Sequence, residues 1–201
     1  MKSIKLLLFI SLGIVLFSSC SKKQGTPTLY ITSELKDYAL FQKGSYWVYK
    51  NDIRQSYDSS RILNDPSVSY FLEGGYDYEY LGQVCHIHYT GTFINDAYLG
   101  PYDYDLSIRG IAFEPIKFVS GTTFTFSDRR KTLTFSKIDT LPIFEKVFYN
   151  VLKTTYVYIA GPNDTISNTS FFVKKVGLVK YISSEAGIDS TWNLYDYKVI
   201  Q

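Results

Sequence analysis

The sequence lacks a hydrophobic run long enough to cross a membrane as a helix. Its longest apolar run, Leu6–Phe17, has twelve residues, whereas a spanning helix needs about 20. The sequence also lacks a Gly-x-Ser-x-Gly elbow, a phosphate loop and a dinucleotide-binding glycine fingerprint. It has only two cysteines, Cys20 and Cys85. The familiar signatures of a catalytic centre are therefore missing, and any hold on a membrane must come from something other than a spanning helix.

The N-terminus has the layout of a secretory signal. A basic head, Met1–Lys5, precedes the apolar run, and two serines then lead into Cys20. A cysteine at this position resembles a bacterial lipoprotein signal, and the resemblance implies that Cys20 is acylated, with palmitate among its chains, and becomes the new N-terminus. Several acyl chains make a stable anchor, unlike a single one. We expect a signal peptide over residues 1–19, a lipidated tether over 20–32 and one domain over 33–201.

Cleavage before Cys20 changes the charge of the chain. Lys2 and Lys5 leave with the signal, so the mature chain carries 19 basic and 19 acidic side chains and a formal net charge of zero. No basic surface is left to neutralise phosphates, which argues against nucleic acid as a partner. With Cys20 acylated, Cys85 has no disulfide partner, and we expect it to be a small buried apolar residue.

Aromatic residues are abundant, with 19 Tyr and 14 Phe, and the hydrophobic pattern after residue 45 has a period of two. About ten short strands separated by turn residues predict an all-β fold. We expect a single antiparallel meander that forms a strongly curved sheet, a half-barrel or an open barrel, with one or two short helices. The expected helices lie at 33–41, with Ser33 as N-cap, and at 142–149. The expected hairpins turn at Gly74-Gly75 and at residues 128–130.

Four residues are expected to support this fold. Gly44 and Gly177 can adopt the backbone conformations that turns require. Trp47 and Trp192 come from opposite ends of the chain and would share one core if the first and last strands meet.

The same residues lie in three segments that resemble a known group. Gly44–Tyr49 reads G-x-x-W-x-Y, Val176–Lys180 reads V-G-L-V-K, and Trp192–Leu194 reads W-x-L. This pattern resembles uncharacterised lipoproteins of Bacteroidetes type. The resemblance implies a cell-envelope location at the outer membrane, leaves the membrane face open, and implies no activity.

The only histidines, His86 and His88, lie two residues apart and so share one face of an expected strand. Two imidazoles so placed can bind a metal, and Asp103 and Asp105 could add carboxylates. The simpler interpretation is a polar strand face turned to solvent, and we favour it.

A stripe of tyrosines is the best candidate for a ligand-binding surface. It comprises Tyr76, Tyr78, Tyr80, Tyr102 and Tyr104. Tyrosine offers an apolar ring with a polar tip, which suits sugars and flat apolar ligands. The alternative is that these rings pack in the core, as aromatic residues in strands commonly do.

The sequence therefore predicts a lipid-anchored cell-envelope binding protein with no catalytic activity and no cofactor. Its partners would be the membrane and a glycan, a lipid or another protein. One alternative is a lipid or lipoprotein carrier with an apolar cavity of about 300–1,000 Å³ in the curved sheet. The other is a metal-dependent enzyme that uses His86 and His88.

Overall fold

The computed structural model describes residues 26–74, 79–90, 96–99, 106–109, 124–128, 131–161, 164–185 and 188–201. One short helix, α2, spans Ser33–Ala39. The strands are β1 Thr28–Leu29, β2 Tyr46–Asn51, β3 Tyr57–Ile62, β4 Ser67–Gly74, β5 Glu79–Thr90, β6 Asp96–Leu99, β7 Leu106–Arg109, β8 Phe124–Asp128, β9 Lys131–Ile143, β10 Lys146–Gly161, β11 Asp164–Val173, β12 Gly177–Glu185 and β13 Ile188–Lys198.

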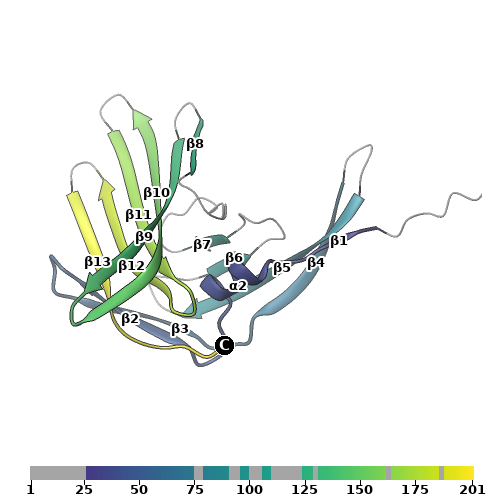
Figure 1. Ribbon diagram of the computed structural model, residues 1–201, viewed down its shortest axis with the longest axis horizontal. Helices are drawn as coiled ribbons and strands as arrows, with labels where there is room; N and C mark the ends of the chain where they lie inside the picture. Colours follow the sequence, from purple (N-terminus) through teal and green to yellow (C-terminus); the bar gives the residue numbers. More distant parts are fainter. Residues whose placement is uncertain are drawn as a thin grey trace, which may run out of the picture.

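The described strands form one curved sheet with the order β7-β6-β5-β3-β2-β13-β12-β11-β10-β9-β8. Neighbours along the chain are neighbours in the sheet, except that β3 pairs with β5 and β4 pairs only with β5. The first long strand, β2, pairs with the last, β13, in the middle. β7 and β8 end the order on opposite sides, so within the described strands the sheet is open (Figure 1). The prediction of an all-β meander in a curved sheet is confirmed. β1 departs from it, because this strand pairs with β5 in parallel.

The predicted helix at 33–41 is present but shifted at both ends. Its N-cap is Thr32, not Ser33, because the Oγ1 of Thr32 accepts a hydrogen bond from the backbone N–H of Leu35 at 3.3 Å. The helix ends at Ala39, since Leu40 is already extended. It buries Leu35, Tyr38 and Ala39 against the sheet core.

The predicted helical turn at 142–149 is wrong. This segment is the end of the β9–β10 hairpin, in which Ile143 pairs with Lys146 and Phe144 has a φ of 52°. The ladder between β9 and β10 continues without a break from Val151 to Tyr158. The long-range pairing of two long strands therefore outweighs a local pattern that fits one turn of helix.

Both predicted hairpins pair their strands. In the hairpin of β8 and β9, Phe124 lies opposite Phe135 and Phe126 opposite Leu133. In the other hairpin β4 pairs with β5, but Gly74 lies opposite Glu79. That register replaces a two-residue turn with a longer connection, whose residues 75–78 lie outside the described structure.

The core is organised around Trp47, which is only 1% exposed. Its indole Nε1 donates a hydrogen bond to the carbonyl oxygen of Val176 at 2.6 Å, and its ring packs against Phe41 with centroids 5.1 Å apart. Gly177 follows with a φ of +92°, and a Cβ there would lie 3.0 Å from the Phe41 ring. Gly177 is therefore needed both for its backbone conformation and for the space it leaves.

The pairing of β2 with β13 places the second tryptophan in the same core. Trp192 lies opposite Asn51 and packs, partly buried, against the core that contains Trp47. The expectation that the first and last strands meet is therefore confirmed. Gly44 has a φ of +90° just before β2, as expected.

The segment expected to be a free tether is held on the sheet over its last residues. Thr28 and Leu29 pair with Leu81 and Gly82, and the Leu81 N–H donates to the Pro27 carbonyl at 2.9 Å. Ile31 is buried at 3% exposure. The domain therefore includes residues before 33, and residues 27–31 are not part of a free tether.

Replacing the two positive-φ glycines separates backbone strain from steric conflict. We expect Gly177→Ala to lower the free energy of unfolding by about 3 kcal/mol, of which about 1 comes from the left-handed conformation and the rest from displacing Phe41. Gly44→Ala is the matched control, because its Cβ would meet only the Cδ1 end of Ile200 at 3.2 Å. It should cost about 1 kcal/mol. Guanidinium unfolding curves measure both losses, and equal losses would contradict the steric argument.

Candidate functional site

The two histidines lie as the strand pattern predicts. His86 and His88 are exposed on β5, while Cys85 and Ile87 on the opposite face are buried at 0% and 1% exposure. Val84, expected on the histidine face, is nevertheless buried at 5%. In the part of the chain that the structure describes, no group of three or more His, Cys, Asp or Glu residues is placed to hold a metal ion. The metal site stays a prediction, since Asp103 and Asp105 lie outside the described residues.

The tyrosine stripe is described at one position. Tyr80 is buried, with 8% of its surface exposed, so at this position the ring packs in the core. Tyr76, Tyr78, Tyr102 and Tyr104 lie outside the described residues, and their role as a binding surface stays a prediction. Over the described ranges, no helix is both long and apolar enough to cross a membrane.

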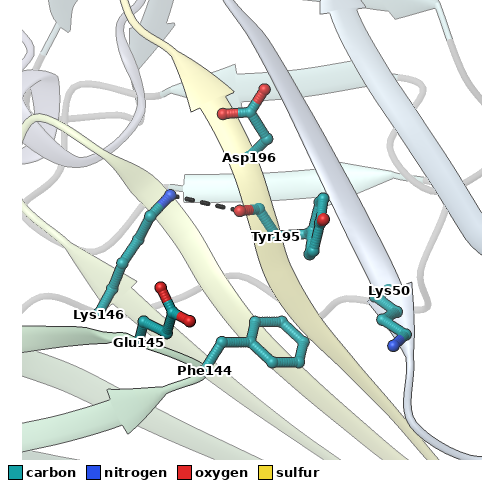
Figure 2. Close-up of a pocket in the computed structure, with 6 residues that line it drawn as sticks. All are labelled: Lys50, Phe144, Glu145, Lys146, Tyr195 and Asp196. Carbon is teal, nitrogen blue, oxygen red and sulfur yellow. Dashed lines mark hydrogen bonds between the residues drawn. The ribbon is translucent and has the colours of Figure 1, made fainter.

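The structure brings a different set of residues together, around a cleft of about 470 Å³ between the β9–β10 turn, β13 and β2. Figure 2 shows the six side chains that line it gathered from these three elements. They are Lys50, Phe144, Glu145, Lys146, Tyr195 and Asp196. The two lysines and two carboxylates balance in formal charge, and the aromatic rings supply the apolar part of the lining.

Two local irregularities place the aromatic rings. On β13 the register with β2 shifts between Leu194 and Asp196, so that Tyr195 is the extra residue of a β-bulge. Leu194 stays fully buried, whereas Tyr195 is 50% exposed. At the β9–β10 turn the positive φ of Phe144 leaves its ring 52% exposed. The cleft therefore depends on a bulge and on a turn.

The exposed rings form a connected cluster. Tyr195 packs edge-on against Phe144, with centroids 5.8 Å apart, and against Tyr57, with centroids 5.2 Å apart. The ammonium of Lys50 lies 5.8 Å from the ring centre of Tyr57 and 5.9 Å from that of Phe144. Each ring is about half exposed, with Tyr57 at 54%. We call Tyr57, Phe144 and Tyr195 the aromatic cluster; it is orientated by its own packing and by a cation.

Hydrogen bonds fix the polar side of the cleft. The Nζ of Lys146 donates to the backbone carbonyl of Tyr195 at 3.3 Å and lies 5.0 Å from the ring centre of Tyr197. The Oδ2 of Asp196 accepts from the hydroxyl of Tyr46 at 3.3 Å, and its Oδ1 accepts from the Tyr197 N–H at 2.9 Å. The lysine thus ties the β9–β10 turn to β13, and the carboxylate is orientated towards β2.

A second cleft of about 370 Å³ lies beside the first on β2 and β3. Tyr46 lines it, and the hydrogen bond from Tyr46 to Asp196 joins the two clefts. The guanidinium of Arg61 lies 6.0 Å from the ring centre of Tyr46. The other lining residues are Val48, Ser59, Ser60, Leu63 and Thr90. Together the two clefts present aromatic, hydroxyl and charged groups, and β2 contributes Tyr46 and Val48 to one and Lys50 to the other.

Sequence reasoning missed this site for identifiable reasons. Strict alternation along β13 assigns Tyr195 and Tyr197 to one face, and the bulge breaks that alternation. Phe144 falls in the segment for which a helix was predicted. Lys50 and Tyr57 are ordinary strand residues, and only the pairing of β2 with β3 places them opposite each other.

Comparisons with known proteins add little. No protein-family model matches the sequence, and no curated protein is significantly similar to it. Among solved structures, a chain from Parabacteroides distasonis described as a "putative lipoprotein" is similar, with a TM-score of 0.36 and 15% sequence identity over 79% of this chain and 98% of that one. A likeness at this level supports no argument, and the site has to be interpreted from its own geometry.

Cys85 gives a direct test of the core. Burial raises the pKa of its thiol to about 11, against a smaller lowering effect of the Lys36 ammonium. We expect a thiol reagent to leave Cys85 of the mature chain unmodified at pH 8 and to label it fully in guanidinium. Because the folded-state pKa is raised, this group favours the folded state below pH 9, and that contribution falls as the pH rises from about 9 through 11. Rapid labelling of the native protein at pH 8 would contradict this burial.

Proposed function

We propose that the protein is a lipid-anchored binding protein of the cell envelope that holds an extended glycan across the two clefts and performs no chemistry on it. The observation that supports this proposal best is the half-exposed aromatic cluster of Tyr57, Phe144 and Tyr195, in which Phe144 and Tyr195 line the cleft together with charged groups and Tyr57 packs against Tyr195. Exposed aromatic groups that converge with a few orientated polar groups are characteristic of binding sites.

The chemistry of the lining favours a sugar over an acyl chain. A pyranose ring has an apolar face that packs on aromatic side chains and a rim of hydroxyls that exchange hydrogen bonds with polar groups. Lys146 and Asp196 are held at the cleft by hydrogen bonds and retain capacity for more. An acyl chain in this cleft would instead strip water from four charged groups without replacing their hydrogen bonds. The carrier hypothesis is therefore less well supported here.

The anchoring part of the proposal is supported by the sequence. The N-terminal signal leads into Cys20, and a few residues later the backbone joins the sheet at Pro27. Acylation of Cys20 would hold the clefts close to a membrane surface, at the outer membrane if the resemblance to Bacteroidetes lipoproteins holds. Mass spectrometry of the N-terminal peptide from membrane-extracted protein tests this part by itself. A peptide that starts before Cys20, or that carries no acyl chains, would contradict it.

The glycan part is tested by native mass spectrometry on the mature chain from Ser21 onwards, with a panel of neutral hexasaccharides built from glucose, mannose or N-acetylglucosamine, and with palmitate in parallel. We expect at least one hexasaccharide to be retained, and Tyr195→Ala to weaken that binding about tenfold, as the loss of a central aromatic contact does. Tyr149→Ala is the matched control. Tyr149 is 63% exposed on the same hairpin but does not line the cleft.

The outcomes separate the hypotheses. Retention of palmitate and of no sugar would favour the carrier. Equal binding by the Tyr195→Ala and Tyr149→Ala variants would place the ligand elsewhere, and failure of every hexasaccharide to bind would overturn the glycan proposal. Unchanged metal content after replacing His86 and His88 together with alanine would remove the metal-dependent alternative.

A further inference from the structure

β4 carries three large apolar side chains in a row on one face. Val68 and Tyr70 are each 53% exposed, and Leu72 is 61% exposed. Because they alternate along the strand, they point to the same side and cover a length of about 14 Å. Single exposed hydrophobic residues are normal on soluble proteins, whereas a contiguous row usually marks a contact surface. We call Val68, Tyr70 and Leu72 the apolar stripe.

None of the three stripe residues has a charged partner on β5, and the nearest charged residue opposite this face of β4 is Glu79, which pairs with Gly74 at the end of the strand. Val68, Tyr70 and Leu72 lie opposite Cys85, Gln83 and Leu81 on β5. The amide of Gln83 donates to the Tyr70 hydroxyl at 3.2 Å, so this polar pair is already satisfied in part. A face of this kind can leave water for an apolar surface without burying a charge.

The first described strand, β1, pairs with the same part of the sheet. β1 pairs with β5 at Leu81, directly beside the stripe, and the next residue after β1, Tyr30, is 61% exposed. Figure 1 shows β1, β4 and β5 projecting together as an arm from the rest of the molecule. From Pro27 back to Cys20 the chain has seven residues, which span at most about 25 Å when extended. An anchor at Cys20 therefore holds this arm, rather than the aromatic cluster, closest to the lipid.

We propose that the apolar stripe lies directly on the lipid surface, so that the arm is a second membrane contact beside the acyl anchor. The proposal rests on the anchoring proposed above and adds an orientation to it. Val68 and Leu72 enter the boundary between headgroups and acyl chains, and Tyr70 sits at the headgroup level, where tyrosine is favoured. The lipid surface covers the uncharged face of β4, which has neither lysine nor proline to protect it.

The experiment supplies the anchor artificially, so that its result does not depend on acylation. The mature chain from Ser21 onwards, which contains every described residue, carries an N-terminal hexahistidine tag. It is held on phosphatidylcholine vesicles that contain nickel-chelating lipid and phosphatidylcholine spin-labelled on the acyl chain. An environment-sensitive fluorophore is attached at Leu72→Cys. Ser69→Cys is the matched control, because Ser69 is exposed on the same strand but points to the other side.

We expect the spin label to quench the fluorophore at position 72 at least about threefold more than at position 69, because a face that enters the interface is buried some 5–10 Å deep. Adding Val68→Ser and Tyr70→Ser should abolish the difference while the circular dichroism spectrum stays unchanged. Equal quenching at the two positions would overturn the proposal. So would sedimentation that shows a dimer without vesicles which the two serine substitutions convert to monomer, because the stripe would then bind a second copy of the chain.

Discussion

The hydrogen bond from Trp47 to the Val176 carbonyl is the contact on which the middle of the sheet depends. It joins β2, where the two halves of the sheet meet, to the turn before β12, on the far side of β13. Phe41 covers the indole, and Gly177 leaves the room that the Phe41 ring needs. A buried indole N–H without this partner would cost more than the hydrogen bond contributes, because the desolvated donor would have no acceptor. One tryptophan and one glycine thus fix the spacing of three strands.

The candidate binding surface depends on the same region, because its residues lie on the outer side of strands whose inner side is the tryptophan core. Tyr49 and Leu194 are fully buried and hold β2 and β13 together. With that side fixed, the bulge leaves two consecutive residues, Tyr195 and Asp196, exposed, whereas regular alternation would turn one of them inwards. The turn at Phe144 then reaches across to meet Tyr195. A rigid core and an irregular edge together give orientated rings that remain open to solvent.

The sequence predicts those features that depend on period and on residue type. It predicts a strongly curved all-β sheet, the hairpin of β8 and β9, and the burial of Cys85 opposite the exposed histidines. The sequence pattern fails where long-range strand pairing determines the structure. Around Phe144 the pattern predicts a helix, but the segment forms the turn of the β9–β10 hairpin. The pattern fails also at Tyr195, because a bulge reverses the face of a strand residue and leaves no local signal. The anchor was suggested by the sequence, whereas the cleft was found only from the structure.

The pairing of β2 with β13 has a consequence for how the chain is made. Tyr46 pairs with Lys198, so the middle of the sheet joins residues from nearly opposite ends of the sequence. That pairing has to wait until the last strand is available, and closing so large a loop makes folding slow. A nascent chain without its C-terminus has β2 but no partner for its β13 side, and its central tryptophan has no Val176 carbonyl to bind. The local hairpins from β8 to β12 can pair before this point, so joining the two halves of the sheet is the step that needs the whole chain.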